Sequence, residues 1–181
     1  NNSAEFGGGI YLKNSLSHYS NIIIRHNHAN YGGGIFITNS DPVLSNLNIY
    51  NNNAISGAGI FVNLYSNIYI SNSKLYNNSA SSYGGAITIE QESAVNLFHC
   101  LISQNIASLY GAGLYSWGNS NFTISNNTIA DNFSEFGSGI TSLSNSSGTI
   151  INSIIWFNEN NIYSDNNDIT AFYSNIENGW Q

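Results

Sequence analysis

The sequence has few charged residues, one cysteine and no long apolar run. Only 7% of its residues are charged, and Lys13, Arg25 and Lys74 stand against ten acidic residues for a net charge of −7. Three separated cations cannot form a phosphate-binding surface, so nucleic acid is a poor partner. The single Cys100 excludes an internal disulfide, and no apolar run approaches the roughly 18–20 residues that cross a bilayer. We expect no membrane span in this segment.

The residues that are present favour a folded, exported chain. With 181 residues, of which 41% are hydrophobic and 13% aromatic, the chain can build the core of one domain. Its 33 asparagines and 28 serines, beside almost no lysine, are typical of a protein kept soluble by amides and hydroxyls. We therefore expect an extracellular or bacterial cell-surface location. The start at Asn1, without a methionine or a leader, leads us to expect a fragment of a larger protein.

A glycine-rich element returns six times along the chain. Its copies are 25, 25, 27, 27 and 26 residues apart, and a fixed period of this size indicates a repeat architecture. The copies are Gly7-Gly8-Gly9-Ile10, Gly32-Gly33-Gly34-Ile35, Gly57-Ala58-Gly59-Ile60, Gly84-Gly85-Ala86-Ile87, Gly111-Ala112-Gly113-Leu114 and Gly137-Ser138-Gly139-Ile140.

A column of asparagines runs in phase with the glycines. An aliphatic residue lies three positions before most of its members, and a further column, of five asparagines and His99, lies three positions before that. The in-phase asparagines are Asn2, Asn27, Asn52, Asn78, Asn105, Asn132 and Asn158, and the aliphatic residues are Ile24, Ile49, Leu75, Ile102, Ile129 and Ile155.

Within each repeat the apolar residues alternate with a period of two, as in 35–37, 68–70, 87–89 and 122–124, and no segment keeps helical spacing. A unit of 25–27 residues with about three short strands cannot bury its apolar face alone, but stacked copies can. The sequence therefore predicts an all-β, single-stranded parallel β-helix of about seven coils. In such a stack, equivalent side chains lie about 4.8 Å apart.

That spacing gives the asparagine column a physical role. An amide placed above another amide can donate its NH₂ group to the carboxamide oxygen of the next coil. We therefore predict a structural ladder formed by Asn27, Asn52, Asn78, Asn105, Asn132 and Asn158. His99 is expected to replace the amide as donor and acceptor in its own column.

The two columns together resemble those of right-handed, pectate-lyase-like parallel β-helix proteins. In particular they resemble the polymorphic outer membrane proteins, whose repeats carry GGA[ILV] and FxxN. The resemblance rests on elements such as Gly84-Gly85-Ala86-Ile87 and Leu75-Tyr76-Asn77-Asn78 and covers residues 1 to about 160, with Ile or Leu where that family has Phe. It implies a right-handed winding, which agrees with the bias of parallel crossovers.

The end of the sequence departs from the repeat. We assign residues 1–160 to β-helix repeats and residues 161–181 to a shortened final coil or the start of a C-terminal cap. Segments 153–158 and 173–180 resemble the terminal block of large secreted β-helix proteins of Bacteroidota-type bacteria, a resemblance that implies export.

The chemistry-bearing residues do not assemble into a reaction centre at the sequence level. Glu90 and Glu92 are expected to share a strand and are the best carboxylate pair for hydrolysis. The three cations lie at different repeat phases, which disfavours a lyase. His26 and His28 lack an evident third ligand. We assign no catalytic residue, metal or cofactor, and the interpretation leans away from an enzyme.

Alternation suggests a surface instead. If the last residue of each glycine element points inward, the residue that follows it points outward, beside a smooth glycine strip. The aromatic residues at these positions, Tyr11, Phe36, Phe61 and Tyr115, are candidates for binding a sugar ring or a protein surface. The other interpretation is that these rings stack along the ladder and stabilise it.

The function predicted from these features is an adhesive or structural binding module at the cell surface, which could self-assemble into filaments through its open ends. Its partner would be a polysaccharide, another protein or a second copy. The alternative is a β-helix domain that binds or degrades polysaccharides.

Overall fold

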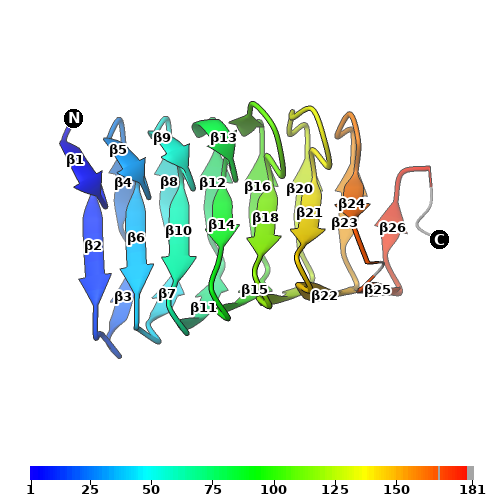
Figure 1. Cartoon of the computed structure of the whole chain (residues 1–181), viewed down its shortest axis with the longest axis horizontal. Helices are drawn as coiled ribbons and strands as arrows, with labels where there is room; N and C mark the ends of the chain where they lie inside the picture. Colours follow the sequence, from blue (N-terminus) through cyan, green and yellow to red (C-terminus); the bar gives the residue numbers. More distant parts are fainter. Residues whose placement is uncertain (167, 179–181) are drawn as a thin grey trace.

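The computed structural model describes residues 1–166 and 168–178. Its described residues form short β-strands wound into successive coils, which follow one another along the long axis from the N-terminus to the C-terminus (Figure 1). Each early coil contributes one strand to each of four parallel sheets, which we call sheets A to D. Four strands per coil is one more than the sequence predicted.

Sheets A and B contain the strands on either side of the glycine element. Sheet A comprises β1 (Ser3–Phe6), β5 (His28–Tyr31), β9 (Asn53–Ser56), β13 (Ser79–Tyr83) and β17 (Ile106–Ala107). Sheet B comprises β2 (Ile10–Lys13), β6 (Ile35–Thr38), β10 (Ile60–Asn63), β14 (Ile87–Ile89), β18 (Leu114–Trp117), β21 (Ile140–Leu143) and β24 (Ile162–Ser164).

Sheets C and D form the other two sides of each coil. Sheet C comprises β3 (His18–Ser20), β7 (Val43–Ser45), β11 (Asn67–Ser71), β15 (Ala94–Phe98), β19 (Asn121–Ser125), β22 (Ser147–Ile151) and β25 (Ile169–Phe172). Sheet D comprises β4 (Ile23–Arg25), β8 (Asn48–Tyr50), β12 (Lys74–Tyr76), β16 (Leu101–Ser103), β20 (Thr128–Ala130), β23 (Ile154–Trp156) and β26 (Asn175–Ile176).

The strand register confirms the predicted parallel β-solenoid. The residue that closes each glycine element pairs with its equivalent in the next coil, in the order Ile10, Ile35, Ile60, Ile87, Leu114, Ile140 and Ile162. Successive members are 25, 25, 27, 27, 26 and 22 residues apart. Equivalent side chains are therefore stacked along the whole described length.

Residues with positive φ make the corners of the coils. The column that contains His99 has positive φ throughout, with values between 48° and 57° for Asn21, Asn46, Asn72, His99, Asn126 and Asn152. His99 is exposed, so our expectation that it replaces an amide in a ladder is wrong. Asparagine predominates here because it tolerates the left-handed conformation better than most side chains.

The predicted asparagine ladder is present and fully bonded in the interior. The side-chain NH₂ group of each member donates to Oδ1 of the next at 2.9–3.1 Å, from Asn27 through to Asn158. The last amide donates to Oδ1 of Asn161, whose own NH₂ group donates to the carbonyl oxygen of Glu177. The chain itself thus ends the ladder on this side.

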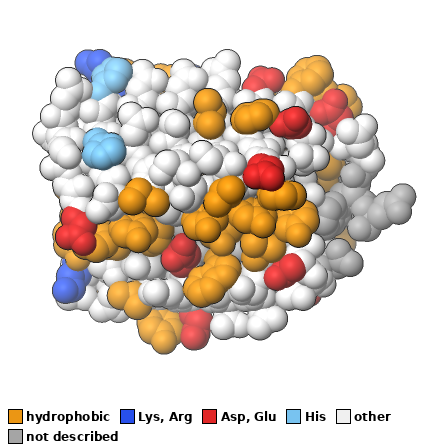
Figure 2. Space-filling model, turned by 45° about the horizontal axis from the view of Figure 1, so that its top comes forward, with side chains coloured by type: hydrophobic (Ala, Val, Ile, Leu, Met, Phe, Trp, Pro, Cys, Tyr) orange, Lys and Arg blue, Asp and Glu red, His pale blue; other side chains and the backbone are white. Residues whose placement is uncertain are grey.

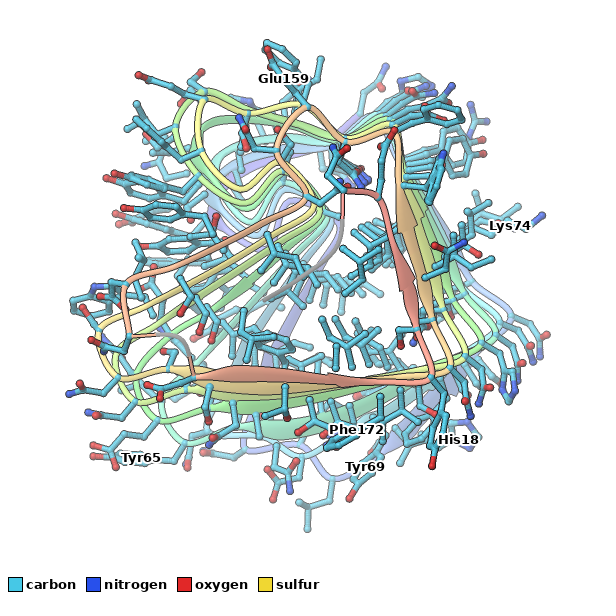
Figure 3. All side chains as sticks on the ribbon, turned by 90° about the vertical axis from the view of Figure 1, so that its right-hand side faces the viewer. His18, Tyr65, Tyr69, Lys74, Glu159 and Phe172 are labelled. Carbon is cyan, nitrogen blue, oxygen red and sulfur yellow. The ribbon has the colours of Figure 1, made fainter. Side chains whose placement is uncertain are left out.

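Aliphatic columns from sheets B, C and D fill the interior, which the view along the axis shows packed with side chains (Figure 3). One position departs from the regular pattern. The Phe122 ring fills the space where residue 148 would place a Cβ, which explains why that residue is Gly148. The core is thus close-packed because similar aliphatic side chains stack on one another in successive coils, and the large Phe122 ring packs over a glycine of the next coil.

Candidate functional site

The predicted aromatic strip lies on the outer face of sheet B, but most of it is buried. Phe36, Phe61 and Tyr115 are 4%, 2% and 6% exposed, and only Tyr11, at 50%, reaches the solvent. Our expectation of an exposed strip is therefore wrong for three of its four members. Binding by this row stays a prediction only for Tyr11.

A second row of aromatic residues covers the first. The residue just before each glycine element packs against the strip residue of the next coil, with ring centroids 4.9 Å apart for Phe6–Phe36 and 5.0 Å apart for Tyr83–Tyr115. Where this second row has Ser56, its partner is the small Thr88, and their hydroxyls lie 3.1 Å apart.

The rings of these two rows also stack along the axis, which covers many of the ring faces, although Phe6, Tyr31 and Phe136 of the second row are 40%, 37% and 39% exposed. Phe36 stacks on Phe61 at 5.4 Å, and Tyr110 stacks on Phe136 at 5.1 Å. Hydrophobic side chains form a row along this face, with acidic side chains beside it (Figure 2). Because sugars stack on exposed ring faces, this double row is better suited to packing than to binding a ligand.

The outer face of sheet D presents a different arrangement, which the sequence analysis missed. Tyr50 and Tyr76 stack at 4.8 Å with an interplanar angle of 9°. In the same column Arg25 precedes them and Ser103 follows, so the second face of the Tyr76 ring has only a small neighbour. The sequence already contained a signal for this column, because its members directly follow the aliphatic column at Ile24, Ile49, Leu75 and Ile102.

A shallow depression of about 390 Å³ lies over this part of sheet D. It is lined by Ile23, Asn48, Tyr50, Lys74, Tyr76, Leu101, Ser103 and Gln104. Lys74 is exposed and projects outward from the sheet (Figure 3). Arg25 and Lys74 are two of the three basic residues of the chain, and none of the sheet D strands contains an acidic residue. The face is therefore locally positive on an acidic protein.

The carboxylates do not form the pair that we expected. Strand β14 ends at Ile89, and Glu92 lies in the following corner with a φ of 59°, so Glu90 and Glu92 do not share a strand. Burial raises the pKa of Glu90. Glu90 is thus a partly buried acid, and its charge helps burial to raise the pKa of Tyr115 on the same sheet.

Three other carboxylates line one depression next to the ends of sheet D strands. Asp131, Glu159 and Glu177 line a depression of about 500 Å³, together with asparagine and phenylalanine side chains but no basic residue. The backbone N–H of Phe157 donates to Oε2 of Glu177 at 2.7 Å. Within residues 1–166 and 168–178, no three His, Cys, Asp or Glu side chains are grouped as a metal site.

The remaining nucleophile is inert. Cys100 is buried, and burial raises the pKa of its thiol to about 11, so almost no thiolate forms at neutral pH. Its backbone N–H donates to Oδ1 of Asn127 at 2.7 Å. Cys100 is thus a packing residue.

A family model described as the right-handed beta helix region matches residues 1–129 of the chain. The chain belongs to the right-handed β-helix family. The match covers most of the coils and supports the general resemblance that the columns indicated, whereas the narrower likeness of this β-helix to polymorphic outer membrane proteins stays a prediction. No curated protein and no solved structure matched the β-helix. None of its described residues forms a helix long and apolar enough to span a membrane.

Proposed function

We propose that this β-helix is a non-catalytic adhesive module of a secreted or cell-surface protein, and that the outer face of sheet D binds an extended acidic polysaccharide. The observation that carries the proposal is the stacked pair Tyr50 and Tyr76 in a shallow depression beside Lys74, with Arg25 at the end of the same column.

The shape of the face suits an extended chain of sugars. It is a parallel sheet that continues over seven strands, and its neighbouring strands lie about 4.8 Å apart. Ser103 and Ala130 are the small residues that follow Tyr76 along the column, and Trp156 comes after them. A pyranose ring has space to lie over the small residues and against the free face of the Tyr76 ring.

The charge of the face selects the class of polysaccharide. A molecule with a net charge of −7 repels polyanions in general, so a local excess of cations is needed to bind one. Lys74 and Arg25 supply that excess, and uronate carboxylates are the groups they would pair with. The stacked tyrosines favour a ring with an apolar face, which a free anion does not offer.

The alternative function is hydrolysis of a polysaccharide, and the group of Asp131, Glu159 and Glu177 favours it over a lyase. A lyase needs a base beside the acids, and no basic side chain lines that depression. Reducing ends released from a uronate polymer, and lost in Glu159→Gln, would favour this alternative over simple binding.

The proposal is tested by titrating the protein with oligogalacturonate and with a neutral glucan oligosaccharide of the same length, using calorimetry. We expect binding of the acidic ligand only, weakening as salt is added. Tyr76→Ala should reduce the affinity about tenfold, or ~1.4 kcal/mol, and Lys74→Ala several-fold.

Matched controls lie on other faces. Tyr69 is an exposed tyrosine on sheet C, and Lys13 is an exposed lysine on sheet B. Tyr69→Ala and Lys13→Ala should leave the affinity unchanged. Equal losses in the sheet D variants and the controls, or equal binding of both oligosaccharides, would contradict the proposal.

A further inference from the structure

An exposed apolar patch lies along the side of the solenoid, on the outer face of β17 and of the coil that follows it. Ile106 and Phe133 are exposed and are paired by an isolated β-bridge, so they lie on neighbouring coils. Leu109 and Phe136 are also exposed, and the backbone N–H of Phe136 donates to the carbonyl oxygen of Leu109 at 2.9 Å. We call these four residues the sheet A patch. Large apolar side chains exposed together on neighbouring coils are typical of an interaction surface.

Hydrogen bonds beneath the patch fix the segment that carries its two phenylalanines. The backbone N–H of Ser134 donates to Oγ of Ser138 at 3.0 Å, and Oγ of Ser138 donates to the carbonyl oxygen of Ser134 at 2.9 Å. Oγ of Ser134 donates to the carbonyl oxygen of Phe136 at 3.0 Å. Because both serines are buried, the segment is ordered before a partner arrives, which lowers the entropy cost of binding.

Carboxylates flank this patch. Exposed and buried residues alternate over residues 131–135, so Asp131, Phe133 and Glu135 are all on the outer side. Neither carboxylate has a hydrogen bond or an ion pair with any of the residues 1–166 and 168–178. One exposed ring therefore lies in the chain between two carboxylates that are available to a partner.

The surrounding charge selects a basic partner. Residues 75–181 contain eight acidic residues and no lysine or arginine, and acidic side chains surround the hydrophobic ones on this face (Figure 2). Beyond the aromatic rows, Glu90 is near enough for its charge to add to burial in raising the pKa of Tyr115. A second copy of this chain, with a net charge of −7, would be repelled, whereas a cationic segment would be attracted.

The spacing of the coils suits a helix that lies parallel to the solenoid axis. One helical turn advances about 5.4 Å and one coil about 4.8 Å, so three successive turns meet three successive coils with a mismatch of only ~1 Å. In the coil before the patch, Ser79 pairs with Ile106, and the backbone N–H of Leu109 donates to the carbonyl oxygen of Ser82. These small side chains leave room for a third turn.

We propose that the sheet A patch binds a basic amphipathic helix of a partner protein. Apolar side chains at positions i, i+3, i+4 and i+7 of that helix cover Ile106, Leu109 and Phe133. Its lysine or arginine side chains pair with Asp131 and Glu135. The apolar contacts supply most of the affinity, and the charges set the orientation and the rate of association.

A synthetic helix of about 14 leucine and lysine residues, with all its leucines on one face, is the probe for this surface. Its binding to the 181-residue chain is followed by fluorescence anisotropy at several salt concentrations. We expect binding that weakens as salt is added but persists, because the apolar contacts remain. A peptide of the same composition with its leucines spread around the helix should bind about tenfold more weakly, and so should one with glutamate in place of lysine.

Substitutions separate the patch from the general attraction between an acidic protein and a basic peptide. Leu109→Ser/Phe133→Ser should weaken binding about tenfold, and Glu135→Lys several-fold. Glu92→Lys changes the net charge by the same amount at an exposed corner, and Tyr69→Ser removes an exposed ring from sheet C. Both controls should keep the affinity within about twofold of the wild type. Circular dichroism should show the same fold in all variants.

Equal weakening in Glu135→Lys and Glu92→Lys would overturn the proposal, because the attraction would then depend on net charge alone. So would equal affinity for the two arrangements of leucine, or the absence of binding to the amphipathic peptide. A loss in Tyr69→Ser without a loss in Leu109→Ser/Phe133→Ser would place the contact on sheet C instead. None of these outcomes bears on the sugar-binding proposal, whose residues lie on sheet D.

Discussion

Oδ1 of Asn78 accepts two hydrogen bonds from Asn52, one from the side-chain NH₂ group at 3.0 Å and one from the backbone N–H at 3.1 Å. The second amide hydrogen of Asn52 points to the carbonyl oxygens of Ile24 and Tyr50. Each buried amide of the ladder therefore bonds the backbone as well as its neighbouring side chain. This ladder ties successive coils together at a corner where strand pairing is interrupted.

Replacing one member of the ladder should be costly. Asn78→Ala leaves two donors of Asn52 without an acceptor. It also removes the side-chain NH₂ group that donates to Oδ1 of Asn105 and to the carbonyl oxygen of Ile49, all in a fully buried site. Each unsatisfied buried group costs about 1–3 kcal/mol, so we expect a loss of roughly 3–5 kcal/mol in the free energy of unfolding. Denaturant unfolding followed by circular dichroism measures this loss.

The neighbouring residue provides the control. Asn77 is exposed and has a φ of 53°, so its side chain has no part in the ladder and its backbone favours glycine. Asn77→Gly should change the free energy of unfolding by less than about 0.5 kcal/mol. A similar loss in both variants would show that the ladder does not stabilise the fold.

The glycine corners should differ in their tolerance of a side chain. A Cβ at Gly84, whose φ is +59°, would lie 2.7 Å from the carbonyl oxygen of Ile87 and closer still to Oγ1 of Thr88. A Cβ at Gly118, with a φ of +71°, has only the backbone nitrogen of Gln91 nearby, at 3.6 Å. Gly118→Ala should cost only the backbone strain, ~1–2 kcal/mol, and Gly84→Ala should cost more.

Thermal unfolding separates these two costs. For a chain of this size, each kcal/mol shifts Tm by about 2–4 °C. Adding Thr88→Ala to Gly84→Ala should recover part of the loss, with a coupling of more than ~0.5 kcal/mol in a double-mutant cycle. Equal Tm values for Gly84→Ala and Gly118→Ala would contradict the packing described for this corner.

Glu90 should make stability depend on pH in an identifiable window. Its pKa in the folded state is raised from the ordinary value of 4.5 by burial, so the folded protein binds its proton more tightly than the unfolded chain does. Stability contributed by this group is present below pH 4.5 and falls as pH rises through the folded-state pKa. Glu90→Gln should therefore raise Tm at pH 7 relative to the wild type, with a smaller difference at pH 4. An equal shift at both pH values would show that Glu90 does not titrate in this way.

Much of the fold was predictable because stacking repeats the same environment in every coil. The 25–27-residue period, the ladder from Asn27 to Asn158 and the inward isoleucines follow directly from spacing. The corner asparagines were misassigned at His99, because an amide that bonds its neighbour and an amide that tolerates positive φ give the same sequence column.

The binding surface was harder to predict for a physical reason. Alternation correctly placed Phe36 and Phe61 on the outer side of a strand, but it does not tell what packs over that side. The residue before the glycine corner, such as Phe6 or Tyr31, packs its ring against the outward ring of the next coil. Tyr50 and Tyr76 stay partly exposed and line a depression on the outer face of sheet D.

The location of the bound sugar distinguishes the outer face of sheet D from every other surface of the molecule. Backbone amide resonances of labelled protein can be followed by NMR during titration with oligogalacturonate. We predict that the perturbed amides cluster on the sheet D strands β8, β12 and β16, around Tyr50, Lys74 and Ser103, while those flanking Tyr11 and Phe136 stay unchanged. Perturbations centred on the aromatic rows between sheets A and B, or none at saturating ligand, would contradict binding at sheet D.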